Sequence, residues 1–506
     1  MNGVHGRIPG RQWSRAIASV HTSCMTTPLT LDPPDWNVYR SLLHRAVDDA
    51  LDHLAALRQG PAWQPMPAIS RDAVRRPLPA EGIGPEALFE EVRRHIAPYA
   101  WGNTHPRSWG WVNGNGSAAG LLADVIAAGM NTNVPLGNQS AAVVEEQVIA
   151  WSRQIMGFPA EATGLLVTGA SIANLVGLTV ARDTMAGTDL PAAGTGSLPP
   201  LTVYASSETH SSIDKAMAIL GLGTRQLRKI PVDQALRLDV RKLHEAIRAD
   251  RAQGLRPICV VGNAGTVNNG GIDDLGALAD VCAAERLWFH VDGAFGAVAM
   301  LAPGRRPQLA GLERADSLAF DFHKWLHVPY EAGCILVRDG AAHRRASFAP
   351  TRSYLVPLER GASAGPDFSQ LGPELSRAFR GLKVWMTLLA HGTTRLGELV
   401  EQNCQQAAWL AERLTQVAHC VVPAPVALNI VPFRLEPSRL PGDRRDAINR
   451  ELLMRLQERG IAIPSGTSIG GRFTLRAAIT NHRTRQDDLE ALAVAVEQLG
   501  AELLSD

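Results

Sequence analysis

The sequence predicts an α/β protein, with a large domain built on a mostly parallel central sheet that has helices on both faces, followed by a small α+β C-terminal domain. Two observations carry this prediction. Between about residues 110 and 395, short β-rich runs alternate with helical patterns, which is typical of parallel strands joined by helices. After about residue 400, strand and helix patterns mix as in an α+β unit. The β-rich runs of the large domain are Thr202–Tyr204, Ile258–Val261, Leu287–Val291 and Cys334–Val337.

The first 31 residues are expected to form a disordered segment. They contain three arginines and no acidic residue, which is also the composition of some organellar targeting peptides. They lack a clear helical stripe, however, and Met25 offers a later start, so the sequence leaves open whether residues 1–24 belong to the mature protein. The expected divisions of the chain are 1–31 (disordered segment), 32–109 (helical arm), 110–395 (large domain) and 396–506 (small domain).

The arm is predicted from two helical patterns. Between Trp36 and Arg58, apolar residues recur every three or four positions, and Gly60 follows as a stop signal. A proline-rich stretch, 61–85, then leads to a second helix over Ala87–Ile96. Such an arm cannot bury its apolar stripe alone, so we expect it to pack on the large domain or on a partner subunit.

Two long polar or Pro/Gly-rich segments, 183–200 and 341–373, interrupt the large domain, and the second is long enough for an active-site lid. A helix is expected over 380–391. The small domain is predicted from strands near 427–433 and 473–479 and a closing helix from Asp487.

The composition favours a small-molecule substrate. With 506 residues, 45% apolar residues and a net charge of +1, the chain can bury a large core and has no charge excess for nucleic acid. No apolar run approaches the roughly 20 residues that cross a bilayer, so no membrane partner is expected. Six scattered cysteines without a CxxC pair favour free thiols in a reducing compartment, the cytoplasm, over disulfides or a metal site.

Lys324 is the first candidate for chemistry. The pair His323-Lys324 directly follows the apolar strand pattern 315–322. A partly desolvated amine at a strand end can have its pKa lowered and attack an aldehyde, as Schiff-base formation requires. An isolated His-Lys pair is more often a surface loop.

Asp292 ends the run before it. An aspartate there could cap the next turn, or its carboxylate could face a pyridine nitrogen and keep it protonated, so that the ring accepts electrons. In the second case Ala294 lies against the ring.

Two upstream segments also follow strands. The small residues 168–171 open a helical run and leave backbone N–H groups that suit a phosphate, although small residues also serve as ordinary caps. His210 follows the strand at Tyr204, where an imidazole could stack on an aromatic cofactor.

The order and spacing of these segments resemble the group II PLP-dependent decarboxylases, the family of aromatic-L-amino-acid, histidine and glutamate decarboxylases. The resemblance covers roughly residues 36–490 and implies the aspartate-aminotransferase-like fold, fold type I, with pyridoxal 5'-phosphate (PLP) as cofactor. It rests on Ala170-Ser171, His210, Gly265-Thr266-Val267, His290 to Ala294, Asp316-Ser317, His323-Lys324 and Ser376-Arg377.

The resemblance implies a role for each matching residue. Lys324 forms the Schiff base, Asp292 pairs with the ring nitrogen, and His210 stacks on the ring. The phosphate contacts are Ala170, Ser171 and His323, and Thr266 touches the ring substituents. Relatives often carry asparagine at Asp321, and a carboxylate beside a phosphate is repulsive unless it points away or is paired; Gly293 replaces a common alanine.

The lid bears on the reaction. Tyr354 aligns with the mobile-loop tyrosine that protonates the α-carbon in the decarboxylases, whereas related oxygen-consuming aldehyde synthases tend to replace that tyrosine or the ring-stacking histidine. Because the chain keeps both, decarboxylation of an L-amino acid to the amine and carbon dioxide is favoured. Oxidative decarboxylation-deamination to an aldehyde stays the alternative, and an inactive binding protein on the same fold is a third.

The substrate is less well specified. Trp109, Trp111 and Asn113 occupy the region where relatives contact the substrate side chain, and tryptophans favour an aromatic or apolar amino acid, although they could equally be core residues. The resemblance also implies a homodimer with its active sites at the interface.

Overall fold

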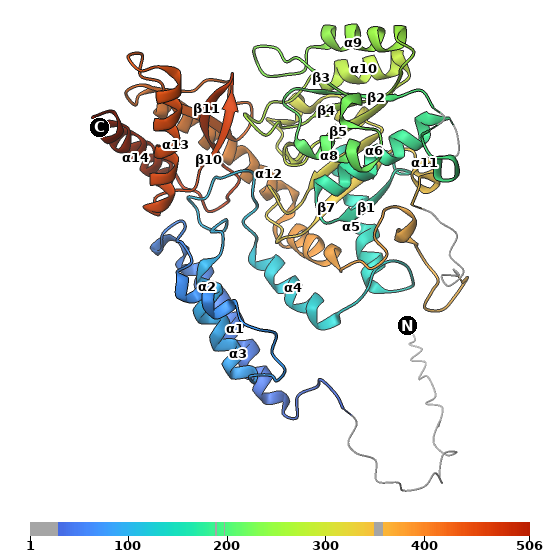
Figure 1. The fold of residues 1–506 in the computed structure, drawn as a ribbon. Coiled ribbons are helices and arrows are strands. Elements are labelled where there is room, and N and C mark those ends of the chain that lie inside the picture. Colours follow the sequence, from blue (N-terminus) through green and yellow to red (C-terminus); the bar gives the residue numbers. More distant parts are fainter. Residues whose placement is uncertain (1–28, 188–189, 197, 349–357, 506) are drawn as a thin grey trace, which may run out of the picture.

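A computed structural model describes residues 29–187, 190–196, 198–348 and 358–505. Within these ranges the chain forms a seven-stranded and a four-stranded sheet (Figure 1). The strands are β1 (Thr163–Val167), β2 (Leu201–Ser206), β3 (Leu227–Ile230), β4 (Arg256–Asn263), β5 (Trp288–Asp292), β6 (Ser317–Asp321), β7 (Gly333–Val337), β8 (Cys420–Val421), β9 (Ile430–Leu435), β10 (Ser465–Ile469) and β11 (Arg472–Ala478).

Helices cover both faces of the larger sheet, pack on the smaller one, and form the N-terminal arm (Figure 1). They are α1 (Trp36–Ala56), α2 (Ala68–Val74), α3 (Pro85–His95), α4 (Ala118–Met130), α5 (Ser140–Met156), α6 (Ala170–Ala186), α7 (Leu190–Ala193), α8 (Ser211–Ile219), α9 (Val240–Ala252), α10 (Leu275–Glu285), α11 (Gly340–Arg345), α12 (Arg380–Thr415), α13 (Gly442–Glu458) and α14 (Gln486–Ser505). No helix of the described ranges is both long and apolar enough to span a bilayer.

The larger sheet has the strand order β1-β7-β6-β5-β4-β2-β3, and its neighbours from β6 to β3 are all parallel. The predicted mostly parallel α/β sheet is therefore confirmed. β7 is the exception, because it runs antiparallel to both β6 and β1. Only a short connection without a helix joins β6 to β7, and a parallel return needs a crossover of a dozen or more residues. Consequently β1 points the same way as β6, and the strands on either side of β7 end at one edge.

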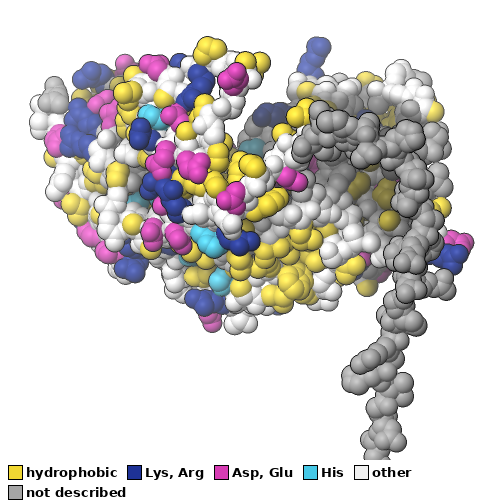
Figure 2. All heavy atoms as spheres, turned by 90° about the horizontal axis from the view of Figure 1, so that it is seen from below, with side chains coloured by type: hydrophobic (Ala, Val, Ile, Leu, Met, Phe, Trp, Pro, Cys, Tyr) yellow, Lys and Arg dark blue, Asp and Glu magenta, His cyan; other side chains and the backbone are white. Residues whose placement is uncertain are grey.

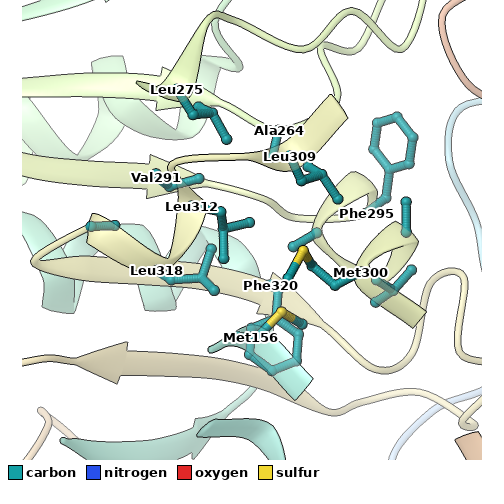
Figure 3. Close-up of a cluster of buried hydrophobic side chains, with 14 of the residues drawn as sticks. Met156, Ala264, Leu275, Val291, Phe295, Met300, Leu309, Leu312, Leu318 and Phe320 are labelled. Atoms are coloured by element: carbon teal, nitrogen blue, oxygen red, sulfur yellow. The ribbon is translucent and has the colours of Figure 1, made fainter. Parts of the chain in front are cut away.

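Two hydrophobic clusters sandwich this sheet. Successive strand residues alternate between them: Val260 belongs to the cluster under α9 and α10, whereas Cys259 and Val261 belong to the cluster under α6 and α8. Figure 3 shows part of the first cluster, which contains Val291, Leu318 and Phe320 from neighbouring strands together with Met300. Burial on both faces explains why the strands read as continuous apolar runs.

The smaller sheet has the order β10-β11-β9-β8 and is antiparallel. It packs with α13, α14 and the second half of α12 around a third hydrophobic cluster. The expected helix over 380–391 is only the first half of α12, since the helix continues beyond a break at Gly392 (φ 70°) to Thr415. The expected division at residue 395 thus falls inside α12, and the domain boundaries stay a prediction.

The two expected helices of the arm correspond to α1 and α3, and the proline-rich stretch between them contains the unpredicted short helix α2. The helices α1 and α3 bury few side chains. Only Leu42 of α1 is buried, whereas Trp36, Tyr39 and Leu43 are exposed. The expected disordered segment lies outside the described residues except for its last three positions, as does the middle of the expected lid.

Candidate active site

A cavity of about 550 Å³ lies at the carboxyl edge of the larger sheet. Loops that follow four different strands line it, because parallel strands deliver the residues after them to one edge. A second cavity, of about 310 Å³, shares His210, Asp292, Ala294 and Lys324 with the first. Sequence reasoning identified these four residues, and the fold brings them together.

Lys324 is held by a carboxylate. Its Nζ lies 3.0 Å from Oδ2 of Asp321, whose side chain is 2% exposed. Burial lowers the pKa of Lys324, but the attraction and hydrogen bond of Asp321 outweigh burial, so the pKa lies above its ordinary value. The expectation of a lowered amine pKa is therefore wrong, because it left out the aspartate three residues earlier.

Both carboxylate oxygens of Asp321 have a partner. Its Oδ1 accepts a hydrogen bond of 2.7 Å from the backbone N–H of Ala170, at the start of α6. Gly333 lies so close that a Cβ there would be 2.8 Å from the same oxygen. The departure from asparagine at this position is thus compensated by pairing, and the carboxylate occupies the N–H group that was expected to contact a phosphate.

His323 is buried beside this pair. Its Nδ1 accepts a hydrogen bond of 3.1 Å from the backbone N–H of Ala332, and its Nε2 lies 3.7 Å from Asp321. Burial lowers the pKa of His323, so the ring is neutral at pH 7 with its proton on Nε2. The ring also packs against Tyr330, at 4.5 Å between centroids.

Asp292, at the end of β5, is only 4% exposed. Its Oδ2 accepts from Nδ2 of Asn174 at 2.9 Å, and its Oδ1 accepts from the backbone N–H of Ala294 at 3.1 Å. Two donors on two oxygens fix the plane of the carboxylate, which borders both cavities.

His210 caps the start of α8. Its Nδ1 accepts the backbone N–H of Ser212 at 3.1 Å and lies 2.8 Å from the Ser212 hydroxyl. Burial lowers the pKa of His210, so the neutral ring carries its proton on Nε2. His210 therefore offers an N–H donor to the cavities.

The remaining predicted cofactor contacts differ in their exposure and in the hydrogen bonds that they already make. Ala170 is buried, Ser171 is exposed, and both line the larger cavity at the N-terminus of α6. Thr266 lines the smaller one, but its hydroxyl already donates to Asn269 at 2.9 Å and accepts from the Gly271 N–H at 3.0 Å.

The three predicted substrate residues lie in different parts of the structure. Trp109 is 1% exposed in the core of the smaller sheet, where its indole N–H donates to Thr484 at 3.1 Å. It is a core residue, so the expected substrate contact does not fit its position. Trp111 lines the smaller cavity and packs on Trp101 at 4.9 Å between centroids. Asn113 accepts a hydrogen bond of 3.1 Å from the hydroxyl of Tyr330, a residue that lines the larger cavity.

Sequence reasoning missed Arg476, on β11. This arginine lines the smaller cavity and is 7% exposed, and its Nε donates to Ser465 at 3.1 Å. Its Nη1 has no hydrogen-bond partner among the described residues. Burial lowers the pKa of Arg476 to about 10, so it remains a cation at neutral pH. A single arginine in a strand pattern carries no sequence signal for this position. A buried cation with a free N–H facing a cavity can bind an anionic group.

Tyr354, the predicted proton donor, lies outside the described residues. Among the residues that are described, no group of three or more His, Cys, Asp or Glu side chains could hold a metal ion.

The donor set of the cavity fits a cofactor with an aldehyde, a ring nitrogen and a phosphate. It contains one lysine amine, a buried carboxylate of fixed orientation, a histidine beside it, and the N-terminus of α6. The least obvious fit is at the phosphate, because Asp321 already accepts the Ala170 N–H.

Comparisons with known proteins agree with this donor set. The family model described as "Pyridoxal-dependent decarboxylase conserved domain" matches residues 68–436. An aromatic-L-amino-acid decarboxylase of Bacillus atrophaeus is 33% identical over 92% of this chain and 96% of its own. An L-2,4-diaminobutyrate decarboxylase of Rhizobium meliloti is 31% identical over 94% of both chains. The solved structure of Oryza sativa TDC with PLP and tryptamine is 28% identical and covers 94% of this chain and 100% of its own, with a TM-score of 0.86.

Proposed function

The chain belongs to the family of pyridoxal-dependent decarboxylases, and on that premise we propose that it converts an aromatic L-amino acid into its amine and carbon dioxide. Its cofactor is PLP. The observation that carries the proposal is the convergence of Lys324, Asp292, His210 and Arg476 around one smaller cavity. When bound, PLP supplies an electron sink for the pair released as the bond to the α-carboxyl group breaks.

We propose that Lys324 carries the cofactor and that Asp292 pairs with its ring nitrogen, with His210 stacked on the ring and Ala294 against it. The carboxylate plane of Asp292 is already fixed by two donors, so little reorganisation accompanies this pairing. The phosphate is assigned to the start of α6, where Ala170 and Ser171 lie, with His323 from the loop after β6 beside them. Thr266 borders the ring substituents.

Arg476 is proposed to bind the substrate's α-carboxylate. Its unpartnered Nη1 borders the same smaller cavity as Lys324 and His210. A guanidinium that holds the carboxylate fixes which α-carbon bond stands perpendicular to the cofactor ring, and that choice selects the reaction. The Nε2–H of His210 offers a second donor to the same group. Tyr354 remains the predicted proton donor to the α-carbon after carbon dioxide leaves.

An aromatic side chain suits the walls of the smaller cavity. Trp111, Val112 and Phe295 line it, and Asp292 is the one carboxylate among its described lining residues. A basic substrate such as a diamino acid needs a further carboxylate partner, whereas an aromatic ring gains from packing on Trp111.

One experiment tests the reaction. The purified protein is incubated with PLP and each of twenty amino acids while carbon dioxide, amine, ammonia and peroxide are measured. Amine and carbon dioxide in equal amounts, without peroxide, are expected for an aromatic amino acid. Aldehyde with ammonia and peroxide contradicts the proposal and identifies the oxidative route. A protein that stays colourless with PLP, or that keeps its visible band in Lys324→Ala, is the inactive binding protein.

We also propose a homodimer. Figure 2 views the side on which α1–α4 lie and shows hydrophobic side chains gathered on that face. Among these helices, α1 and α4 carry the exposed apolar residues Trp36, Tyr39, Leu43, Leu122, Val125, Ile126 and Met130. Such a surface is stabilised by burial against a second copy. Analytical ultracentrifugation should give twice the chain mass of 54.4 kDa; a monomer at micromolar concentration contradicts this proposal.

A cytoplasmic location is proposed on the cysteines. The five described cysteines are free and buried, which suits a reducing compartment. Fractionation of the source cells, with detection of the native protein, tests it; recovery outside the cytoplasm contradicts it.

A further inference from the structure

Asn174, which the sequence did not single out, lies between the two groups that flank the cofactor ring in the proposed function. It is on α6 and is 0% exposed, and its side-chain amide makes three hydrogen bonds of 3.0 Å or less, two from Nδ2 and one at Oδ1. Its Nδ2 donates to Oδ2 of Asp292 at 2.9 Å and to Oγ of Ser212 at 3.0 Å. Ser212 in turn contacts Nδ1 of His210 at 2.8 Å.

A hydrogen bond with His290 determines the orientation of the Asn174 amide. Because an ionised carboxylate only accepts hydrogen bonds, the NH₂ group of Asn174 faces Asp292 and its Oδ1 faces His290, 2.9 Å from Nε2. Nε2 of His290 therefore carries the proton. Burial lowers the pKa of His290 to about 4, so the ring is neutral and its Nδ1 accepts.

The hydrogen-bond chain continues to an indole. Nδ1 of His290 lies 2.8 Å from the hydroxyl of Ser317, and the Ser317 oxygen accepts from Nε1 of Trp288 at 2.8 Å. The indole N–H can only donate, so the direction of every hydrogen bond from Trp288 to Asp292 is determined. His290 and Ser317 are both 0% exposed, so water does not compete.

The backbone also accommodates this chain. Gly177 of α6 faces the His290 ring, where a Cβ would lie 2.6 Å from Cε1. The absence of a side chain at Gly177 lets α6 approach β5 closely enough for Asn174 to reach both His290 and Asp292.

We propose that Asn174 is a positioning residue that orients Asp292 toward the cofactor ring nitrogen and, through Ser212, fixes His210 as an Nε2–H donor. This inference rests on the proposed function. Asn174 makes two branches of hydrogen bonds, one to Asp292 and one through Ser212 to His210. The effects of the two branches on cofactor binding can be separated, because only the branch to Asp292 depends on the ring nitrogen.

The test uses PLP and an analogue whose ring nitrogen is replaced by CH. The dissociation constants of both are measured by absorbance titration for the full-length wild type, Asn174→Leu and Asn174→Ala. Loss of the donors to a buried carboxylate should weaken PLP binding about 10- to 100-fold. Binding of the analogue should weaken less than binding of PLP, and only as much as in Ser212→Ala, because Asp292 then has no ring nitrogen to pair with and only the branch to His210 contributes.

Two further variants serve as controls. Ser212→Ala cuts only the branch to His210, so it should weaken PLP and the analogue equally. Asn449→Leu removes another buried asparagine, whose side chain hydrogen-bonds the backbone of Leu435 and Arg445 in the smaller domain, and it should leave both affinities unchanged. Melting temperatures of the cofactor-free variants report whether each folds.

The proposal is overturned if the ratio of analogue to PLP dissociation constants in Asn174→Leu and Asn174→Ala equals that of the wild type. The proposed function fails separately, if wild type forms no visible band with PLP or if the band survives Lys324→Ala. A wild type that binds PLP and releases carbon dioxide, with an unchanged ratio in both variants, therefore contradicts only the role of Asn174.

Discussion

Asp321 Oδ2 lies 3.0 Å from Lys324 Nζ, while Oδ1 of the same carboxylate accepts the N–H of Ala170. One buried carboxylate thus neutralises the candidate Schiff-base amine and also occupies part of the expected phosphate site. Under the proposed function, both contacts would have to be given up for PLP to be held there, so we expect Asp321 to oppose cofactor attachment.

Replacing Asp321 by asparagine should speed cofactor attachment. Asparagine keeps an acceptor for Ala170 but removes the charge that raises the pKa of Lys324, so more of the amine is neutral at pH 7.5. The rate of appearance of the visible band after mixing with PLP should rise about 3- to 10-fold. Stopped-flow measurements between pH 6 and 10 should also show the rate profile displaced toward lower pH.

Asp250→Asn is the matched control, since Asp250 is buried and paired with Arg228 but lies on α9, away from the cavities. It should leave the attachment rate unchanged. Slower attachment in Asp321→Asn, or an undisplaced profile, contradicts the assigned role of Asp321.

Arg476→Gln should impair turnover without impairing cofactor binding. Glutamine removes the buried cation proposed to hold the substrate carboxylate, and the loss of such a charge-assisted contact should lower kcat/KM about 100-fold. The PLP dissociation constant should stay within about 2-fold of wild type, because the side chain of Arg476 hydrogen-bonds Ser465 alone among the described residues. Steady-state kinetics with the best amino acid, and titration with PLP, measure the two quantities. Equal losses in both indicate a structural role instead.

Trp109 and Trp111 should give opposite results on truncation. Trp109→Ala removes a fully buried side chain and should lower the free energy of unfolding by about 3–5 kcal/mol. Trp111→Ala, at a residue 42% exposed, should cost less than about 1 kcal/mol but raise KM for an aromatic amino acid. Urea unfolding and kinetics on both variants check this. Equal destabilisation by the two substitutions contradicts it.

The folded protein should lose stability in mild acid, and His343 should account for part of the loss. His343 is 0% exposed, with Nε2 2.8 Å from the Leu371 carbonyl and Nδ1 2.8 Å from the Thr163 hydroxyl. Burial lowers the pKa of His343 to about 4, whereas an unfolded histidine has a pKa near 6.5. Between about pH 6.5 and 4 only the unfolded state binds this proton, so stability falls as the pH falls.

Each such histidine should contribute a slope of about 1.4 kcal/mol per pH unit within that window. His343→Gln keeps a donor and an acceptor but does not titrate, so its free energy of unfolding should depend less on pH by about this slope. Urea unfolding at pH 7 and pH 5 measures the difference. An identical pH dependence in wild type and variant rules out His343 as a contributor.

The sequence by itself determined the fold class and the core of the candidate site. Lys324, Asp292, His210 and Ala170 became candidates because each comes soon after an apolar run, and parallel strands deliver such residues to one edge of a sheet. Each was ambiguous by itself, and the resemblance of their order and spacing to the group II decarboxylases implied their roles. Local apolar patterns predicted the arm helices and the C-terminal strands.

The tertiary structure alone decided which of the two tryptophans is core. In a regular strand Trp109 and Trp111 face the same side, so the sequence treated them alike. Instead, the backbone N–H of Trp109 donates to the Ile463 carbonyl at 2.9 Å, beside the smaller sheet. Trp111 adopts a left-handed backbone conformation (φ 56°). The alternation is broken there, so the two side chains reach different surroundings.

Distance along the chain explains the rest. Asn174 and Asp292 are 118 residues apart, and Arg476 reaches the cavity from a strand of the other sheet. No pattern in the sequence relates such positions, because their contact depends on how α6 packs on β5 and how the smaller sheet docks beside the larger one. The sequence therefore identified the residues that chemistry requires at strand ends, whereas only packing revealed those that hold them, because packing joins residues remote in the chain.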